Sequence, residues 1–260
     1  MPRVSGLVLV LVISTSCADA AWRGLSAEPA RRPGQEAAGI PQIFDGVPTS
    51  DYPAVAGVVV LLDGGLVASC TGTLISPSVV LTAAHCVASG PLAIATVFFP
   101  GGATAVQYDV VQYAIEPEFS PDVLAVADIA LLLLASPVAG VTPMPLATKT
   151  PRPGTKSIIV GYGQDETGNV GLKEFGTIRL RKCPRKFPAG GLARGQLSRS
   201  LCWRPKRRHQ DTCHGDSGGP LLANSALAGV TSGGYPDCPG ILSWDTNVVP
   251  FLPWIDAHLQ

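Results

Sequence analysis

The feature that most constrains this chain is the run at residues 215–220, Gly-Asp-Ser-Gly-Gly-Pro. A serine between glycines presents its hydroxyl on a tight turn, and the small neighbours let a substrate carbonyl and two backbone N–H groups approach one point. A serine hydroxyl is a weak nucleophile unless a base lies beside it and a third group orients that base. The run therefore indicates nucleophilic chemistry at Ser217 and requires a base and an acid elsewhere.

Two upstream segments supply candidates for these roles. His85 lies in Thr-Ala-Ala-His-Cys at 82–86, beside a cysteine that would fix its loop, and Asp128 opens Asp-Ile-Ala-Leu-Leu at 128–132. The competing Asp109 and Asp122 lack that following apolar run. The order His, Asp, Ser along the chain is that of chymotrypsin-like enzymes, and it differs from the orders in subtilisins and α/β-hydrolases.

On these three motifs, the chain from residue 43 to residue 260 resembles the trypsin/chymotrypsin family of serine proteases. The resemblance implies an all-β fold of two six-stranded antiparallel barrels of chymotrypsin-like type with a short C-terminal helix. It implies a serine endopeptidase that forms an acyl-enzyme on Ser217, with His85 as general base and Asp128 orienting His85. The N–H groups of Gly215 and Ser217 would form the oxyanion hole, and no cofactor or metal is implied.

The resemblance also assigns a substrate pocket. Asp211 stands six residues before Ser217, at the family's pocket floor, where a carboxylate favours cleavage after Arg or Lys. Ser232, Gly234 and Gly240 match the pocket wall. Gly233 replaces the tryptophan usual beside Ser232, so the preference of the neighbouring subsite stays open.

A further correspondence concerns activation. Residues 43–46, Ile-Phe-Asp-Gly, resemble the Ile-Val-Gly-Gly at which the family is cut, and the new α-amino group of Ile43 would pair with Asp216. Residues 21–42 would be a polar, Pro/Gly-rich pro-segment or linker before the protease domain at 43–260. Because Gln42 is not basic, a trypsin-like enzyme would not cut here itself, and the activating protease stays unidentified.

Composition supports many short strands. The chain has 29 glycines and 24 prolines among 260 residues, and short apolar runs alternate with turn signals. A helix is predicted at Pro253–Leu259 and a linker at Pro143–Pro153. The predicted strands of the first barrel are Val58–Leu62, Leu66–Ser69, Gly72–Ile75, Val79–Thr82, Ile94–Phe99, Val106–Ile115 and Ile129–Leu134. Those of the second are Ser157–Gly161, Thr177–Leu180, Leu201–Trp203, Pro220–Leu222, Leu227–Thr231 and Ile241–Trp244.

Seven cysteines and the N-terminal segment indicate export. Residues 1–20 combine Arg3, an apolar run and a small-residue cleavage site, which is typical of a secretory signal peptide; a lipoprotein signal with lipidated Cys17 is the alternative. Removing Cys17 leaves six cysteines, which indicates three disulfides in an oxidising compartment, extracellular or periplasmic, with 15 pairings open. The family resemblance selects Cys70–Cys86, Cys183–Cys202 and Cys213–Cys238. Metal ligation is disfavoured, because no CxxC pair occurs.

The charge and hydropathy of the chain limit the kinds of partner that it can have. Charged residues are 15% of the chain and the net charge is zero, which argues against nucleic acid or an anionic membrane as a partner. No other run of 18 apolar residues predicts a membrane span. The resemblance implies polypeptide substrates, protein protease inhibitors and an activating protease. The basic run at 206–209, Lys-Arg-Arg-His, is a solvated loop or else an exosite or autolysis site.

One rival interpretation comes from another class of protein. A protease-like domain can keep the fold as a catalytically silent binding protein. Such proteins usually lose a triad residue or the oxyanion glycine, whereas this chain keeps His85, Asp128, Ser217 and Gly215.

Overall fold

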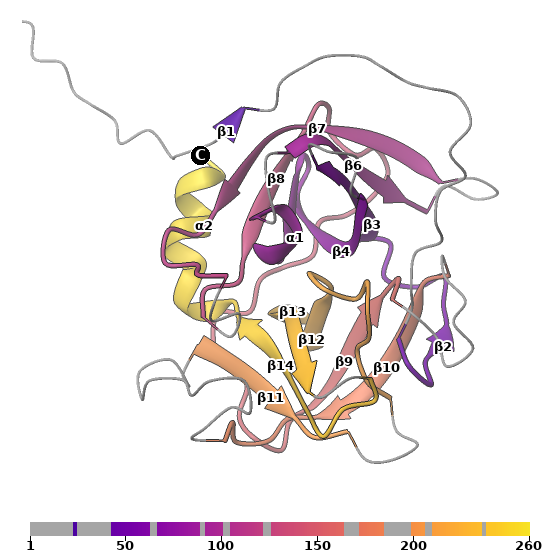
Figure 1. Cartoon of the computed structure of the whole chain (residues 1–260), viewed down its shortest axis with the longest axis vertical. Helices are drawn as coiled ribbons and strands as arrows, with labels where there is room; N and C mark the ends of the chain where they lie inside the picture. Colours follow the sequence, from indigo (N-terminus) through magenta and orange to yellow (C-terminus); the bar gives the residue numbers. More distant parts are fainter. Residues whose placement is uncertain are drawn as a thin grey trace, which may run out of the picture.

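The structure is a computed structural model that describes residues 23–24, 43–62, 67–88, 92–100, 105–121, 126–163, 172–184, 199–205, 210–235 and 238–260. The predicted signal peptide at 1–20, nearly all of the predicted pro-segment and the basic run at 206–209 lie outside these residues. Two β-sheets form the two halves of the molecule, the N-terminal one above the C-terminal one in Figure 1. Of the helices described, none is long and apolar enough to cross a membrane.

The N-terminal sheet closes into a barrel of six antiparallel strands in the order β7-β6-β3-β4-β5-β8. Strand β7 closes it, because its first half pairs with β6 and its second half, beyond an irregularity at Val110–Gln112, pairs with β8. A two-residue strand, β1 (Arg23–Gly24), adds to β7. The six strands are β3 (Val55–Leu62), β4 (Val67–Ser76), β5 (Val79–Thr82), β6 (Leu92–Phe99), β7 (Val106–Ile115) and β8 (Ala130–Leu134).

The C-terminal sheet has the order β11-β14-β13-β12-β9-β10-β2. Its β12–β13 hairpin turns through Asn224 and Ser225, whose φ angles of 52° and 63° are those of a two-residue type I′ turn. The strands are β2 (Val47–Pro48), β9 (Lys156–Gly161), β10 (Glu174–Arg179), β11 (Ser200–Trp203), β12 (Pro220–Ala223), β13 (Ala226–Tyr235) and β14 (Leu242–Asn247).

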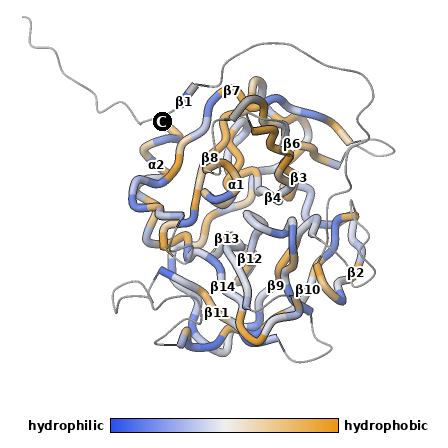
Figure 2. The backbone as a smooth tube through the Cα atoms, in the orientation of Figure 1, coloured by the Kyte–Doolittle hydropathy of each residue, from blue (hydrophilic) through white to orange (hydrophobic). Residues whose placement is uncertain are grey.

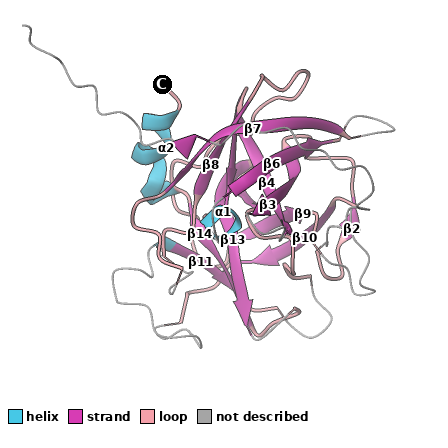
Figure 3. Cartoon of the chain, turned by 45° about the horizontal axis from the view of Figure 1, so that its top comes forward, coloured by secondary structure: helices cyan, strands magenta, loops and turns pink. Residues whose placement is uncertain are grey.

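The second barrel closes less completely than the first. Between β10 and β11 the described residues contain no strand pairing, only an isolated bridge between Arg181 and Cys202. All six strands predicted for the second barrel are present, so the predicted fold class is confirmed. The sequence did not predict the gap between β10 and β11, which we call the seam. Figure 3 shows how strands dominate both halves.

The predicted segments agree well with the observed ones. Val79–Thr82 and Val106–Ile115 match β5 and β7 at both ends, whereas Leu66–Ser69 and Gly72–Ile75 are one continuous strand, β4. The prediction of two strands was wrong, because Cys70 and Thr71, which lie between the two predicted segments, also pair with β3. Strands β1 and β2 and the short helix α1 (His85–Ala88) were not predicted.

Apolar side chains fill both barrels and the junction between them. Figure 2 shows hydrophobic colouring on several strands of the first barrel. One buried cluster joins that barrel to Val230, Leu242 and Trp244 of the second and to Ile255 of the C-terminal helix. This helix, α2 (Leu252–His258), follows a 3₁₀ turn at Val249–Phe251 and has a proline in its first turn, as predicted. The shared cluster fixes the two barrels against each other.

Candidate active site

The three predicted catalytic residues come from both barrels. His85 begins α1 directly after β5, and Asp128 precedes β8, so both belong to the first barrel. Ser217 precedes β12 of the second barrel. Hydrogen bonds across the junction therefore decide how these three residues lie relative to one another.

His85 and Asp128 are joined twice. Asp128 Oδ2 lies 2.7 Å from His85 Nδ1, and Asp128 Oδ1 accepts the His85 backbone N–H at 2.9 Å. The Asp128 side chain is fully buried, whereas that of His85 is 25% exposed. The carboxylate thus engages Nδ1 and leaves Nε2 as the nitrogen that would exchange a proton with a nucleophile.

Two residues of the second barrel hold Asp128. Ser232 Oγ donates to Asp128 Oδ2 at 2.6 Å, and Thr246 Oγ1 donates to the Asp128 carbonyl at 3.0 Å. Ser232 was predicted as part of the pocket wall, but its buried hydroxyl contacts the Asp128 carboxylate. Sequence reasoning missed Thr246, because no local motif marks a threonine on β14.

Thr71 on β4 fixes the Ser217 loop, a role that the sequence did not reveal. Its backbone N–H donates to the Ser217 carbonyl at 2.8 Å, and its hydroxyl donates to the Gly215 carbonyl at 2.9 Å while accepting from Tyr162 N at 3.1 Å. Gly218 follows with φ 83°, and a Cβ there would lie 2.3 Å from the Thr71 carbonyl oxygen. Only glycine allows the serine loop to approach the first barrel this closely.

Asp216 is buried beneath the Ser217 loop. Its two carboxylate oxygens accept N–H groups from Gly163 at 2.6 Å and from Cys213 at 2.7 Å. Burial raises the pKa of Asp216 well above its ordinary value; the Cys213 bond lowers it, and the nearby Asp211, Glu174 and Asp245 raise it further. A Cβ at Gly163 would lie 2.1 Å from this carboxylate, so the pocket depends on glycine there.

Ile43 lies in the same barrel with its side chain fully buried. Its carbonyl accepts Gly46 N at 3.1 Å, and the adjacent Phe44 exchanges backbone hydrogen bonds with Asp211. The contacts described for residues 43–62 and 210–235 include no hydrogen bond between Ile43 and Asp216. In this uncut chain the nitrogen of Ile43 is a peptide N–H, so the structure does not bring the predicted pair together.

Asp211 is the most heavily hydrogen-bonded carboxylate of the site. Oδ1 accepts the Trp203 indole N–H at 3.1 Å, the Thr212 N–H at 2.9 Å and the Ser243 hydroxyl at 2.7 Å. Within the described residues, Oδ2 accepts one hydrogen bond, from the Gly240 N–H at 2.9 Å. Burial raises the pKa of Asp211, and these four hydrogen bonds offset part of that effect. Oδ2 is therefore the oxygen with capacity for a further donor.

Two of the predicted wall residues, Gly240 and Gly234, lie near this carboxylate. A Cβ built on Gly234 would lie 3.5 Å from Ser243 Oγ, so Gly234 faces the hydroxyl that holds Asp211. Gly233 packs against Trp244, because a Cβ built on Gly233 would lie 2.8 Å from Trp244 Cζ2. The buried ring of Trp244 on β14 thus occupies the space beside Gly233.

Three disulfides brace these loops with the pairing that the family resemblance selects: Cys70–Cys86, Cys183–Cys202 and Cys213–Cys238. The first ties β4 to the helix that begins with His85, and the last ties the Ser217 loop to the wall near Gly240. Among the described residues, one group has metal-ligand proximity, namely Cys70, His85 and Cys86. Both of its cysteines are in a disulfide, so this group offers no thiolate to a metal.

Comparisons with known proteins agree with this geometry. A family model described as Trypsin matches residues 43–255. Snake venom serine protease HS112 of Bothrops jararaca is 31% identical over 207 residues, which cover 72% of this chain and 76% of that protein. Kallikrein-8 of Homo sapiens is 29% identical over 208 residues, which cover 72% and 75%.

Solved structures show the same similarity. The structure of GrC superposes with a TM-score of 0.73 and 26% identity, over 84% of this chain and 99% of that one. Neuropsin, a serine protease expressed in the limbic system of mouse brain, gives a TM-score of 0.69 and 26% identity, over 84% and 100%.

Proposed function

This chain belongs to the trypsin family and is a serine-type endopeptidase, and from that premise we propose that it cleaves peptide bonds through an acyl-enzyme on Ser217. The observation that carries the proposal is the 2.7 Å contact between His85 Nδ1 and the buried Asp128 carboxylate, at the junction where Thr71 fixes the Ser217 loop. The substrates are polypeptides.

The proposed steps are those of the serine-protease mechanism, with the residues of this chain in its roles. His85 Nε2 takes the proton of Ser217 Oγ as that oxygen attacks the scissile carbonyl, and it returns the proton to the leaving amine. Water then attacks the acyl-enzyme with His85 again as base. Asp128 keeps the proton on Nδ1 and stabilises the imidazolium. The N–H groups of Gly215 and Ser217 would stabilise the tetrahedral oxyanion, each contributing about 3 kcal/mol.

The substrate side chain before the cut would be Arg or Lys. Three donors on Asp211 Oδ1 hold the carboxylate in one orientation, and Oδ2 keeps capacity for a cationic donor. A cation that binds beside this carboxylate would stabilise its charged form and so oppose the rise in the Asp211 pKa that burial causes. These two properties support an Arg/Lys preference.

Export and processing complete the proposal. The apolar segment within residues 1–20 and the three disulfides support secretion. Cleavage after Gln42 by another protease would create the α-amino group that pairs with Asp216. Protein protease inhibitors would act as competing partners at the same site.

The test is covalent labelling with an active-site-directed organophosphonate bearing an arginine-like side chain. The processed wild-type chain is expected to take up one label at Ser217, and Ser217→Ala to take up none. The matched control is Ser50→Ala, which replaces an exposed serine outside the site and should be labelled like the wild type. A folded, processed wild-type chain that takes up no label would instead support the silent binding protein.

A further inference from the structure

Among the described residues, the edge of β10 at Arg179 faces the seam of the second barrel without a partner strand. β10 pairs with β9 along one edge, but β2 covers only Glu174 and Phe175 on the other. Near one end of the seam the Thr177 N–H donates to Gln210 Oε1 at 2.6 Å. Beyond the other end the Arg181 N–H donates to the Cys202 carbonyl at 2.7 Å. Arg179 lies between Thr177 and Arg181, the residues that make these two hydrogen bonds.

The direction of these bonds shows where the Arg179 backbone points. In an antiparallel ladder alternate residues direct their N–H and C=O groups to the same edge. Thr177 and Arg181 direct theirs into the seam, whereas Leu180 donates to the Thr155 carbonyl on the β9 side. Arg179 therefore directs its backbone N–H and C=O into the seam, where no strand of the described part of the chain pairs with them.

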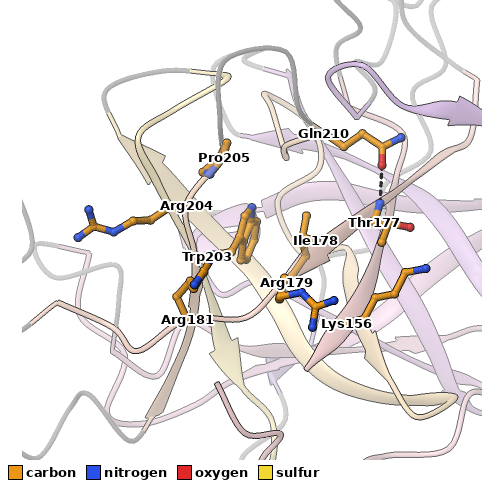
Figure 4. Close-up of a pocket in the computed structure, with 9 residues that line it drawn as sticks. All are labelled: Lys156, Thr177, Ile178, Arg179, Arg181, Trp203, Arg204, Pro205 and Gln210. Carbon is orange, nitrogen blue, oxygen red and sulfur yellow. Dashed lines mark hydrogen bonds between the residues drawn. The ribbon is translucent and has the colours of Figure 1, made fainter. Parts of the chain in front are cut away.

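A cavity of about 320 Å³ occupies this seam, and its size lies at the lower end of the range for ligand sites. Figure 4 shows the Trp203 ring at its centre, Lys156 and Arg179 on one side, and Arg181 and Arg204 on the other. Trp203 is fully buried and held by its indole hydrogen bond to Asp211, so the floor of the cavity is fixed. The remaining lining residues are Thr177, Ile178, Pro205 and Gln210.

The positive charge of the cavity lining is not balanced by any carboxylate among the described residues. The described lining residues include four basic side chains and no acidic one. Within the described residues the ion pairs are His85–Asp128 and Arg199–Glu118, so none of the four is neutralised by a neighbouring carboxylate. The Arg179 side chain donates a hydrogen bond from Nη1 to the Gly154 carbonyl at 2.6 Å. In a chain of zero net charge, this is a local concentration of positive potential that attracts an anionic ligand.

We propose that this seam binds a short acidic peptide segment of a partner protein in extended conformation. The segment adds to the β10 edge at Arg179 by backbone hydrogen bonds, and its carboxylates pair with Lys156, Arg179, Arg181 and Arg204. The strand edge selects a peptide backbone, and the four cations select acidic side chains. Lys156 and Gly161 stand at opposite ends of β9, roughly 16 Å apart along the strand, and Gly161 contacts Asp216. The cationic end of the seam thus lies away from Ser217, while Trp203 on its floor contacts Asp211 of the substrate pocket.

The test measures the binding of a fluorescent, capped hexapeptide of alternating valine and glutamate by anisotropy, using the full chain with Ser217→Ala to prevent hydrolysis. The double variant Lys156→Gln/Arg204→Gln is expected to raise Kd at least tenfold. Arg152→Gln, an exposed arginine outside the lining, should leave Kd unchanged. Equal Kd values for the double variant and this control would overturn the proposal.

Two peptide controls keep the test independent of any variant's folding. Replacing glutamate by glutamine should weaken binding at least tenfold, and N-methylation of the valines should weaken it similarly, because the methyl groups remove the backbone donors. Hydrogen exchange at the Arg179 amide should slow when the acidic peptide binds. If the N-methylated peptide or a sulfated oligosaccharide of equal charge binds as tightly, or the Arg179 amide is unaffected, the seam is a general polyanion patch and the proposal fails.

Discussion

The hydroxyl of Ser232 donates a 2.6 Å hydrogen bond to Asp128 Oδ2, the same oxygen that contacts His85 Nδ1. Ser232 lies on β13 of the second barrel, whereas Asp128 and His85 lie in the first. The orientation of the proposed base therefore depends on how the two barrels pack, as well as on the loop that carries it.

Ser232→Ala should lower kcat by about tenfold to a hundredfold with little change in KM, because a hydrogen bond to a charged group contributes about 1.5–3 kcal/mol. The measurement is steady-state hydrolysis of a peptide ester. Ser243→Ala is the matched control, since its hydroxyl holds Asp211 and should affect substrate preference and KM instead. Identical effects of the two variants would contradict separate roles for these serines.

Thr71→Val tests the support of the Ser217 loop. The variant keeps the side-chain shape but leaves the Gly215 carbonyl and Tyr162 N–H without a partner, which should cost about 1–3 kcal/mol of stability and lower kcat. Thr73→Val, two residues along β4, is the control, because Thr73 Oγ1 is buried with no hydrogen-bond partner in the described structure. That change should be neutral or stabilising by denaturant unfolding. A Thr73→Val loss as large as that of Thr71→Val would refute this assignment.

Asp211→Ser should remove the preference for Arg and Lys. The variant deletes the buried carboxylate, and an unpaired buried cation would cost about 2–5 kcal/mol, so cleavage after Arg should fall by about 30-fold to 5,000-fold. Trp203→Phe removes one donor but keeps the carboxylate, and it should retain the preference. Cleavage profiling with a peptide library measures both. A wild-type profile dominated by Phe or Leu would show that Asp211 does not receive the substrate.

Cleavage after Gln42 should raise activity strongly. A free α-amino group has a pKa near 8, roughly, and its charged form would pair with the buried Asp216 carboxylate. Removing either partner of a buried pair costs about 3–5 kcal/mol, so Asp216→Asn should be cut without gaining activity. N-terminal sequencing of the active form, with activity before and after processing, checks this. Full activity with an N-terminus upstream of Ile43 would exclude it.

Lys173 should give the folded state a measurable dependence on pH. Burial lowers the pKa of Lys173 to about 8, Asp51 offsets part of that effect, and Nζ donates to the Tyr52 carbonyl at 3.0 Å. The unfolded chain binds more protons between pH 8 and 10.5, so stability rises with pH across that window. Relative to Lys173→Met, the wild type should gain about 1 kcal/mol from pH 7 to 10, a discounted figure because solvent partly screens the ammonium. A pH-independent difference in denaturant unfolding would contradict the buried charge.

Most of the fold could be predicted from the sequence, because the signals for strands and turns are local. Alternating apolar residues and Gly/Pro turns marked the strands, so β5 and β7 were predicted to the residue. The break predicted between Ser69 and Gly72 was wrong, because Cys70 and Thr71 continue the pairing of β4 with β3. The pairing of the six cysteines came from family resemblance, because spacing alone left 15 possibilities.

Site residues with a local motif were assigned from sequence, whereas their partners across the barrels were not. His85, Asp128 and Ser217 each lie in a distinctive run, and that order along the chain is itself a signal. No local sequence signal marks the roles of Thr71, Thr246 and Trp203. Each role depends on a contact between strands that are distant in sequence and meet at the junction of the barrels or in the pocket. The sequence determined which chemical groups are present and the local structure around them. Only tertiary packing decided which donor meets which carboxylate and where the second barrel stays open, because hydrogen-bond partners and strand edges are set by distances that no local pattern encodes.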